Sequence, residues 1–372
     1  MLAVAALSAR AIVESAARDG IRCVALDVFG DADTRAAAAR WVSIADSSAL
    51  RIDGERLLAA LSTLAREDDV TGWVPGSGFE GRPEWLEAGA RLLPLLGTAG
   101  ADVRRVRDPQ TFFEFLDASG VAHPPVCLTP PHTPGPWLHK NSGQCGGWHV
   151  RRGANARPGQ GSYWQFERAG PALSATFVAN GEDAVVLGFN RQHVQAIGER
   201  PFVFAGVVGP VMPSDAMQRT IGDAVRKLAR EFRVRGLAGL DFVLHGDTAE
   251  VIELNPRPPA SLALYPRVGG HGALHAHRRA CMQGVLPPAP APADGVRGIQ
   301  IVFAPRALRL DADGAAMIAN WPGAHDLPHA GATFMPGDPL CSLSSSGADA
   351  LHVQAALTHG REGLLQWLGR ER

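Results

Sequence analysis

The sequence predicts a mixed fold with an α/β part, an α+β part and a small β-rich part. In residues 1–100, apolar strands alternate with amphipathic helices, the order that builds a parallel sheet. From Asp108 onward, short strands are separated by turn residues, which favours an antiparallel sheet. A Pro/Ala segment, Leu286–Gly295, then precedes a β-prone tail. With 372 residues, 46% of them hydrophobic, the chain is long enough for two or three domains with cores.

The N-terminal elements follow a βαβ rhythm. The expected strands are Leu2–Leu7, Ile21–Asp27 and Val70–Val74, and the expected helices are Arg10–Asp19, Thr34–Arg40, Gly54–Arg66 and Pro83–Arg91. This order predicts a Rossmann-like parallel sheet with helices on both faces. Asp27 ends the second strand, where an NAD-binding acid would stand. Ser8-Ala9-Arg10 follows the first strand in place of G-x-G-x-x-G, which argues against NAD binding.

Ligands of open α/β sheets lie at the carboxyl ends of the strands. Four residues of the strand-end loops are therefore candidate substrate contacts: Ser8, Arg10, Ser77 and Glu80. Ordinary turns and helix caps remain the alternative reading of each one.

The later elements are mostly strands. The expected helices are Pro109–Ser119, Asp215–Phe232 and about Ala348–Leu368. The expected strands are Trp137–Lys140, His149–Arg152, Ser162–Glu167, Ala172–Ala179, Ala184–Phe189, Gly298–Leu310 and Gly337–Ser344, with a hairpin over Gly239–Asn255. Turn signals such as Asn180-Gly181 between the strands indicate antiparallel pairing.

Composition excludes several functional classes. The 36 Lys and Arg nearly balance the 37 Asp and Glu, so we expect no nucleic-acid partner. No apolar run is long enough to span a bilayer, so we expect no membrane, and Met1–Leu7 lacks the basic start of a signal peptide. The five cysteines are scattered without metal or redox spacing, which favours a reducing cytoplasm.

The strongest chemical signal is the hairpin Gly239–Asn255. If it turns around Gly246–Thr248, Asp241 faces Glu253, Val243 faces Val251 and Leu244 faces Glu250. Two opposed carboxylates repel each other unless a cation lies between them. Asn255 points to the same face as Glu253 because strand side chains alternate. Two carboxylates and an amide oxygen suit Mg²⁺ holding a nucleotide phosphate, and Arg257 can fork onto phosphate oxygens. A surface hairpin with solvated acids is the alternative, which the apolar flanking residues disfavour.

The second signal is a lysine beside a glycine-rich loop. The chain has two lysines, and one of them, Lys140, precedes Gly143, Gly146 and Gly147. Glycines let backbone N–H groups approach phosphates, and a lysine adds a compact charge. A flexible hairpin is the alternative reading of this loop taken alone.

Together these motifs resemble the ATP-grasp superfamily over roughly Ala101–Pro288. The resemblance implies an ATP-grasp domain of two α+β subdomains, with ATP and Mg²⁺ as cofactors and Mn²⁺ as an alternative ion. It assigns Asp241, Glu253 and Asn255 to the metal. It assigns these residues to ATP: Lys140, Gly143, Gly146, Gly147, the hinge residues Gln165, Phe166, Glu167 and Arg168, and Gln110.

Three positions differ from the family pattern. The segment before the lid has no lysine, so Gln110 or Arg107 takes that place. Gln165 stands where the hinge often has Glu, and Ala172 stands where a Glu often grips the ribose.

In detail the chain resembles the predicted ATP-grasp carboligases of bacteria, which implies a carboxylate–amine ligase. The resemblance gives catalytic roles to Lys140, Arg257 and Arg267, and makes Arg191 a further carboxylate anchor. The partners would be a small carboxylate and an amine, with a homodimer compatible. Some relatives accompany C1-carrier cofactor pathways. The alternatives are a non-catalytic or partner-dependent ATP-binding protein and a biotin-carboxylase-like ATPase.

The resemblance also sets the expected domain boundaries. They are an N-terminal α/β domain over 1–100, an ATP-grasp domain over 101–285 with a lid around 123–165, a linker over 286–295, and a C-terminal β-rich domain over 296–372.

Overall fold

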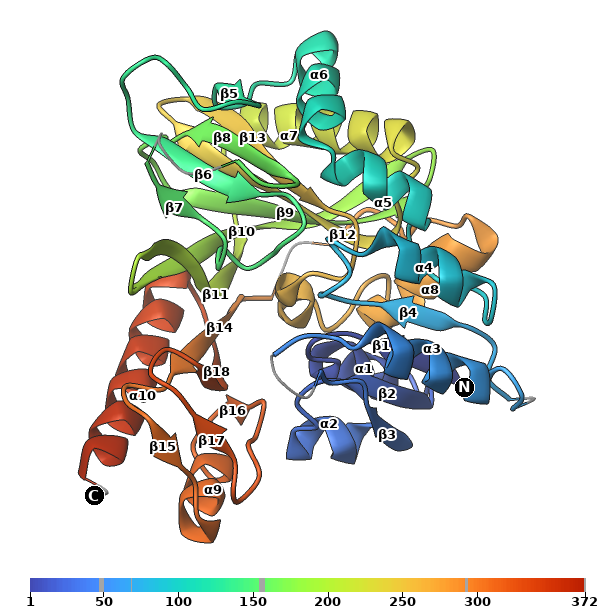
Figure 1. The fold of residues 1–372 in the computed structure, drawn as a ribbon, viewed down its shortest axis with the longest axis vertical. Helices are drawn as coiled ribbons and strands as arrows, with labels where there is room; N and C mark the ends of the chain where they lie inside the picture. The colour runs from blue at the N-terminus through green and yellow to red at the C-terminus, as the bar shows by residue number, and fades with distance from the viewer. Residues whose placement is uncertain (47–49, 68, 154–157, 292–293, 371–372) are drawn as a thin grey trace.

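A computed structural model describes residues 1–372 except 47–49, 68, 154–157, 292–293 and 371–372. Parts of the predicted lid and linker therefore lie outside the described residues. Figure 1 shows a blue N-terminal lobe, a green and yellow lobe above it, and a red C-terminal lobe beside the blue one. The three lobes meet near the middle of the view.

The N-terminal lobe is the predicted parallel α/β domain. Its sheet has the order β3-β2-β1-β4, and every pairing is parallel. The strands are β1 (Leu2–Ala5), β2 (Cys23–Asp27), β3 (Arg40–Ser43) and β4 (Trp73–Pro75); the helices are α1 (Arg10–Arg18), α2 (Ala32–Ala37), α3 (Gly54–Leu64) and α4 (Pro83–Ala90). Strand β3 was not expected. The helix predicted over Thr34–Arg40 ends at Ala37, and Trp41 on β3 donates its indole N–H to Asp27 at 2.6 Å.

The middle of the chain forms two antiparallel sheets. The larger has eight strands in the order β13-β12-β9-β10-β11-β14-β18-β16, and the smaller has the order β5-β8-β6-β7. Their strands here are β5 (Val126–Cys127), β6 (Trp137–Asn141), β7 (Arg151–Arg152), β8 (Ser162–Phe166), β9 (Ala172–Asn180), β10 (Ala184–Ile197), β11 (Arg200–Val211), β12 (Arg235–His245) and β13 (Thr248–Asn255). The helices are α5 (Gly100–Arg107), α6 (Pro109–Ser119), α7 (Asp215–Glu231), the 3-10 turn η1 (Ala260–Leu264) and α8 (Ala273–Gln283).

The C-terminal segment extends the large sheet. Strands β14 (Val296–Phe303) and β18 (Pro339–Gly347) continue it from β11, and β16 (Ala324–His325) closes its edge. The remaining elements are β15 (Leu308–Arg309), α9 (Ala312–Ala319), β17 (Thr333–Phe334) and α10 (Ala350–Arg370). The segment is therefore joined to the middle lobe by backbone hydrogen bonds, and its boundary as a domain stays a prediction.

Two strand predictions need correction. The strand predicted over Ala184–Phe189 runs on to Ile197 and pairs with β11, which was not expected. The strand predicted over His149–Arg152 shrinks to Arg151–Arg152, because the residues before it form turns.

In the hairpin, a bulge follows Asp241. Phe242 therefore pairs with Val251, and Val243 pairs with Glu250, so the predicted partners of Val243 and Leu244 were wrong by one residue.

Two of the five hydrophobic clusters of the described residues join helices and sheets around the large sheet. Phe177, Phe232 and Phe242 are fully buried where α6 and α7 pack on the large sheet. A second core links the N-terminal sheet to the large sheet through α1 and α8. No helix within the described residues is both long enough and apolar enough to cross a bilayer.

Candidate active site

The β12–β13 hairpin places the three predicted metal ligands together. Asp241 pairs directly with Glu253, as the numbering of the hairpin predicted. Asn255 lies on the same face, and its amide Nδ2 donates to Asp241 Oδ2 at 3.0 Å. The prediction that these side chains converge is confirmed, because the bulge begins only after Asp241. Their role as metal ligands stays a prediction.

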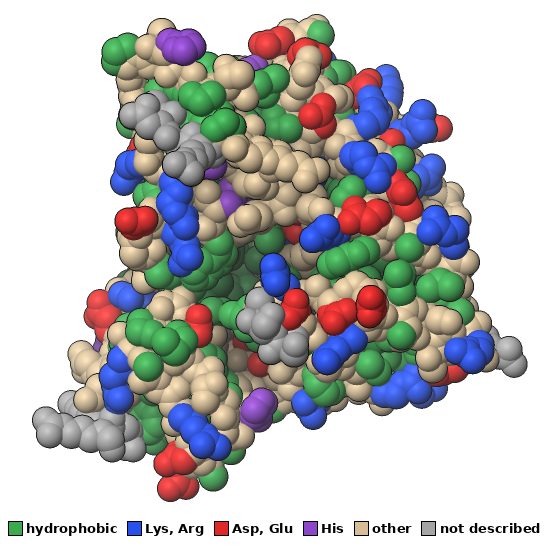
Figure 2. Space-filling view, viewed as in Figure 1, with side chains coloured by type: hydrophobic (Ala, Val, Ile, Leu, Met, Phe, Trp, Pro, Cys, Tyr) green, Lys and Arg blue, Asp and Glu red, His purple; other side chains and the backbone are tan. Residues whose placement is uncertain are grey.

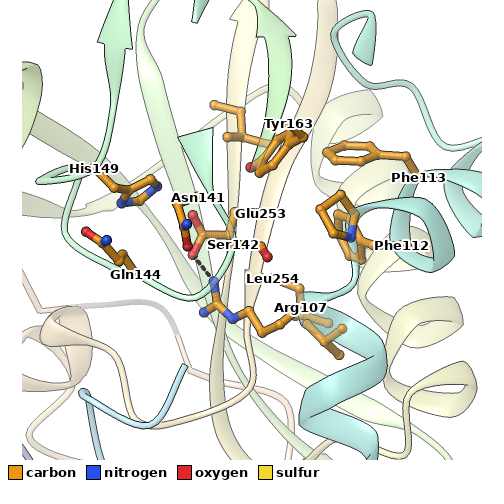
Figure 3. Close-up of a pocket in the computed structure, with 13 residues that line it drawn as sticks. Arg107, Phe112, Phe113, Asn141, Ser142, Gln144, His149, Tyr163, Glu253 and Leu254 are labelled. Atoms are coloured by element: carbon orange, nitrogen blue, oxygen red, sulfur yellow. Dashed lines mark hydrogen bonds and ion pairs between the residues drawn. The ribbon is translucent and has the colours of Figure 1, made fainter. Parts of the chain in front are cut away.

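Arg107 closes this arrangement from the end of α5. Its guanidinium donates to Glu253 Oε1 at 2.7 Å and to Asn255 Oδ1 at 3.0 Å. The side chain is only 8% exposed, so this pairing is largely shielded from water. Figure 3 shows Arg107 reaching across from its helix to the carboxylate of Glu253. Arg107, and not Gln110, therefore contacts the hairpin, and which of the two takes the place of the family's lysine stays a prediction.

Arg257 and Glu80 join the N-terminal lobe to the same site. Arg257 Nε donates to Glu80 Oε1 at 2.6 Å, and Arg257 Nη2 lies 3.4 Å from Asn255 Oδ1. The other oxygen of Glu80 accepts the backbone N–H of Gly78 at 2.7 Å. The strand-end loop after β4 is thus fixed to the hairpin by a charged pair with little exposure to water.

Lys140 lies on β6, opposite this group. It is buried, and its Nζ donates to Gln165 Oε1 at 2.6 Å. The Nε2 of Gln165 is buried with no hydrogen-bond partner among the described residues.

We call the six charged residues of this site the cleft cluster: Glu80, Arg107, Lys140, Asp241, Glu253 and Arg257. Figure 2 shows the hollow near the centre of this face, bordered by Lys and Arg side chains.

The charges of the cleft cluster act on one another. Desolvation and the charge of Glu253 raise the pKa of Asp241 to about 7. Desolvation would also raise the pKa of Glu253, but Arg107, His149 and Lys140 together outweigh it and hold that pKa below its ordinary value. Burial lowers the pKa of Lys140 to about 8, against the pull of Glu253 and Asp241. The two carboxylates therefore differ: Glu253 is held as an anion and Asp241 is the more basic.

The glycines of the predicted lid loop are in close contact with other backbone. A Cβ on Gly147 would lie 1.8 Å from the carbonyl oxygen of Phe202, and Gly147 has φ +74°. The carbonyl of Gly146 accepts the N–H of Phe204 at 3.0 Å. A Cβ on Gly81 would lie 2.6 Å from the carbonyl oxygen of Gly143. The loop is therefore docked on β11 and on the N-terminal lobe, which glycine alone permits. The role of these glycines in binding phosphate stays a prediction.

The predicted hinge, Gln165–Arg168, lies at the end of β8. The N–H of Phe166 donates to Pro125 at 2.9 Å, and the N–H of Glu167 donates to Pro136 at 2.7 Å. Arg168 forms an ion pair with Glu250 at 2.8 Å. Two of the hinge amides are thus engaged within the protein, so adenine binding by this segment stays a prediction.

Among the described residues, no hydrogen bond or ion pair joins three of the predicted residues to the cleft cluster. Gln110 is exposed and donates to Glu114. Arg267 and Arg191 are exposed too. Arg191 neighbours Gln192 on β10, and Gln192 donates to Asp241 at 2.8 Å, so alternation turns Arg191 to the other face of the sheet.

The predicted substrate contacts divide into two groups. Glu80 belongs to the cleft cluster, and Ser77 precedes it in the same loop, where the Ser77 carbonyl accepts the N–H of Leu7 at 2.9 Å. Ser8 and Arg10 instead contact Asp326 of the C-terminal segment.

The sequence analysis did not identify two residues of the site. Gln192 holds Asp241 from the neighbouring part of the sheet, and no local pattern marks it. His149 lines the pocket drawn in Figure 3, and its Nδ1 is buried without a hydrogen-bond partner in the described part of the chain. Burial lowers the pKa of His149 to about 4, so the ring is neutral. In the sequence, its position directly after the glycine-rich loop was the feature that could have indicated His149 as a site residue.

Comparison with known families agrees with this geometry. Residues 106–261 match the ATP-grasp domain family. The matched segment begins just before Arg107 and includes the whole β12–β13 hairpin.

Curated relatives match over a short stretch. The carbamoyl phosphate synthase large chain of Thermoplasma volcanium is 30% identical over 114 residues, which is 31% of this chain and 11% of the relative. The same protein of Deinococcus deserti is 30% identical over 107 residues, or 29% of this chain and 10% of the relative. The chain thus spans about a tenth of the length of these curated relatives.

Solved structures match over nearly the whole chain. An L-amino acid ligase from Bacillus licheniformis has a TM-score of 0.71 at 15% identity, covering 97% of this chain and 96% of that one. An N5-carboxyaminoimidazole ribonucleotide synthetase from Thermotoga maritima has a TM-score of 0.66 at 14% identity, covering 97% of each. The biotin carboxylase of Campylobacter jejuni has a TM-score of 0.71 at 13% identity, covering 95% and 89%. These likenesses show that the three-lobed fold is shared.

Proposed function

We propose that this protein is an ATP-dependent ligase that joins a carboxylate to an amine through an acyl phosphate. The observation that carries the proposal is the cleft cluster inside an ATP-grasp domain. It brings three cations and two hairpin carboxylates together from α5, β6, β12, β13 and the loop after β13. The similar solved structures include an L-amino acid ligase, which supports a ligase activity in this fold.

The residues of the hairpin fit a hard divalent cation. Asp241, Glu253 and Asn255 offer carboxylate and amide oxygens, the donors that Mg²⁺ prefers. Arg107 now bridges Glu253 and Asn255, so a cation held there must share these oxygens with Arg107 or displace it. When bound, Mg²⁺ would supply charge neutralisation at the phosphate oxygens.

The protein's own cations would stabilise the charge on the transferred phosphoryl group. Arg107 and Arg257 can fork onto oxygens, and Lys140 supplies a point charge from the opposite sheet. In the free protein these cations are held by Glu253, Glu80 and Gln165. We infer that they exchange these partners for phosphate oxygens when ATP binds.

The bond changes follow from this placement. An oxygen of the carboxylate substrate attacks the γ-phosphorus, and the bond from that phosphorus to ADP breaks. The amine then attacks the acyl carbon and the acyl–phosphate bond breaks, with the amine proton leaving on inorganic phosphate. The docked loop that carries Gly146 and Gly147 would exclude water, which otherwise hydrolyses the acyl phosphate.

The substitution Glu253→Gln tests the proposal. It keeps the side-chain shape but removes the charge that faces Asp241 and Arg107, so we expect ADP formation to be abolished while the protein stays folded. Asp247→Asn is the matched control, because Asp247 lies in the exposed turn of the same hairpin. Retained turnover in the Glu253→Gln protein would refute the assignment.

An ATP-binding protein without ligase activity is the second candidate. Gln165 and Ala172 favour it, since they replace residues that the family often uses for the nucleotide. Hydroxylamine distinguishes the two, because an acyl phosphate is trapped as a hydroxamate when a carboxylate is turned over. A biotin-carboxylase-like activity would instead give ATP hydrolysis stimulated by bicarbonate.

Finer assignments stay predictions. They are use of Mn²⁺ in place of Mg²⁺, a homodimer, a cytoplasmic location, a role in C1-carrier cofactor biosynthesis, and carboxylate anchoring by Arg191 and Arg267.

A further inference from the structure

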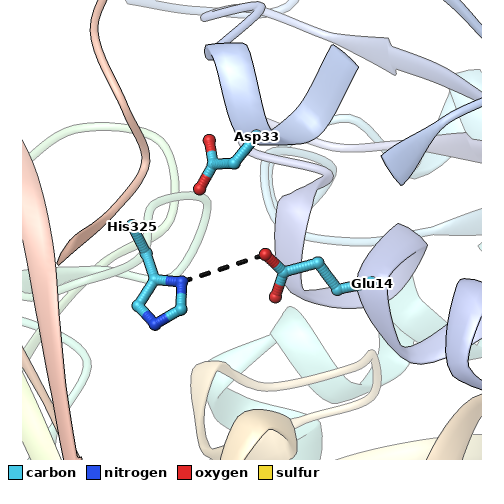
Figure 4. Close-up of side chains that lie close together, drawn as sticks. All are labelled: Glu14, Asp33 and His325. Carbon is cyan, nitrogen blue, oxygen red and sulfur yellow. Dashed lines mark ion pairs between the residues drawn. The ribbon is translucent and has the colours of Figure 1, made fainter. Parts of the chain in front are cut away.

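A second charged cluster lies where the N-terminal lobe meets the C-terminal segment. Glu14 comes from α1, Asp33 from α2 and His325 from β16. One donor atom from each lies within 4.8 Å of the others, and Figure 4 shows the three side chains pointing toward one another. We call this group, with Arg10, Asp31 and Asp326, the seam cluster.

His325 is held by a hydrogen bond at the ring nitrogen that faces away from Glu14. Its Nε2 lies 2.8 Å from Ser344 Oγ, and the Ser344 hydroxyl also lies within hydrogen-bond distance of the carbonyl of Gly323. If the hydroxyl donates to Gly323, at 3.4 Å, it accepts from Nε2–H, and Nδ1 of a neutral ring then carries the lone pair. Nδ1 lies 3.9 Å from Glu14 Oε1. Such an arrangement is typical of a metal-binding imidazole oriented by a second hydrogen bond.

Negative charge exceeds positive charge in the seam cluster. The carboxylates of Glu14, Asp33 and Asp326 share one guanidinium, that of Arg10, at 3.0, 3.8 and 2.8 Å. One cation cannot neutralise three acids, and partly shielded carboxylates without a counter-charge repel one another.

Asp31 is a fourth carboxylate here, and it lacks a partner. It is only 9% exposed. It stands at the N-cap of α2, yet its side chain does not cap the helix, and no hydrogen bond reaches its carboxylate from the described residues. The charges that act on it include those of Asp326 and Asp33, so it faces the same cluster. Burial and the nearby acids raise the pKa of Asp31 to about 8, so near neutral pH this group is largely a neutral acid.

We propose that Glu14, Asp33 and His325 bind a divalent transition-metal ion at this seam. An imidazole combined with carboxylates suits Zn²⁺ or Mn²⁺ better than Mg²⁺ or Ca²⁺, which prefer oxygen donors alone. Asp326 adds negative charge near the ion, and the peptide N–H groups of Asp326 and Leu327 orient Asp33, at 2.8 and 3.1 Å. The ion is separate from the nucleotide site, so this inference does not rest on the proposed function.

The ion would tie together three elements that are far apart in the sequence. It would hold β16 against α1 and α2, beside Ser8 and Arg10, which already contact Asp326. The expected consequence is a more stable seam between the N-terminal lobe and the C-terminal segment, because binding to the folded state alone raises stability.

Zinc titration of the full chain tests the site. After chelator treatment and removal of the chelator, calorimetry with Zn²⁺ alone should show one tight equivalent. Glu14→Gln and His325→Ala should each weaken this binding at least about tenfold. His275→Ala is the control, because His275 and His271 stack at 4.2 Å between ring centroids and offer a competing surface site. His275→Ala should keep the tight equivalent.

Two results would overturn the proposal. One is the absence of a tight equivalent in the unaltered protein for both Zn²⁺ and Mn²⁺. The other is tight binding that survives Glu14→Gln and His325→Ala but is lost in His275→Ala. Glu14→Gln keeps a hydrogen-bond acceptor for Arg10, so it decides the matter even if His325→Ala fails to fold. Glu253→Gln should leave Zn²⁺ binding unchanged, which separates this site from the nucleotide site.

Discussion

The cleft cluster and the seam cluster differ in how their charges balance. In the cleft, three carboxylates face three cations, and each cation already has a partner within the protein. At the seam, the three carboxylates of Glu14, Asp33 and Asp326 share the single guanidinium of Arg10. Both clusters join parts of the chain that are distant in sequence. They differ in the balance of positive and negative side chains.

This difference indicates two ways of receiving a charged ligand. The balanced cleft can exchange partners: its cations turn to phosphate oxygens while its carboxylates turn to a metal ion. The seam has no spare cation to exchange, so it needs an added one. A balanced cluster is thus suited to turnover, and an unbalanced one is suited to retaining an ion.

The largest expected effect comes from removing one cleft cation. Arg107→Met should lower ATP turnover roughly 100-fold or more, because a preorganised donor to the transferred group is lost. Arg107→Lys should recover part of the rate, since it restores the charge without the fork. Steady-state ADP release measures both variants.

Gln110→Ala is the control for Arg107. Gln110 is exposed and contacts only Glu114 among the pairs described above, so its loss should leave the rate nearly unchanged. A larger loss in Gln110→Ala than in Arg107→Met would reverse the assignment of the two residues.

The next prediction concerns a buried polar side chain that carries no charge. His277 is fully buried, accepts the N–H of Leu237 at its Nδ1 and contacts the carbonyl of Leu96 at 2.9 Å. Burial lowers its pKa from 6.5 to about 4, so the unfolded chain takes up the proton first. Its contribution to stability is complete above about pH 6.5 and is lost as the pH falls toward about 4, by about 3 kcal/mol.

Urea unfolding across this pH range measures the effect. In His277→Gln the loss of stability between pH 6.5 and 4 should shrink by that amount, whereas in His329→Ala, at an exposed position, it should not change. An unchanged pH profile in His277→Gln would contradict the buried neutral ring.

The docking of the glycine-rich loop gives a smaller effect. Gly147→Ala should lower turnover about tenfold, because its Cβ would collide with the carbonyl of Phe202 and displace the loop that excludes water. Gly246→Ala has a similar positive φ of +59° but meets nothing within 4 Å, so it controls for backbone strain alone. Equal effects of the two substitutions on turnover would show that loop docking is unimportant.

An exposed ion pair should have the smallest effect. Arg152 pairs with Glu167 at 2.7 Å, but the arginine side chain is 61% exposed. Arg152→Ala should change the free energy of unfolding by less than about 1 kcal/mol, since water and salt screen such pairs. A larger change would mean that exposure is a poor guide to the strength of charged pairs in this chain.

The sequence predicted the parts of the site that lie close together along the chain. The opposition of Asp241 and Glu253 follows from the numbering of a hairpin, and Asn255 follows from strand alternation. The bulge after Asp241 could not be predicted in this way, because one extra residue shifts the pairing beyond it.

Contacts between segments that are far apart in the sequence were harder to predict. Arg107 reaches Glu253 across 146 positions, and Arg10 reaches Asp326 across 316. The length of β10 was underestimated because its second half alternates polar and apolar residues and depends on β11 for its pairing. Such features come from tertiary packing, which no local pattern encodes.

Calorimetry of ATP binding with and without Mg²⁺ tests the central claim most directly. The account predicts Mg²⁺-dependent binding that is retained in Asp247→Asn and lost in Glu253→Gln. Equal Mg²⁺-dependent binding by the unaltered protein and by Glu253→Gln would contradict it, because the β12–β13 hairpin would then not hold the metal–nucleotide complex.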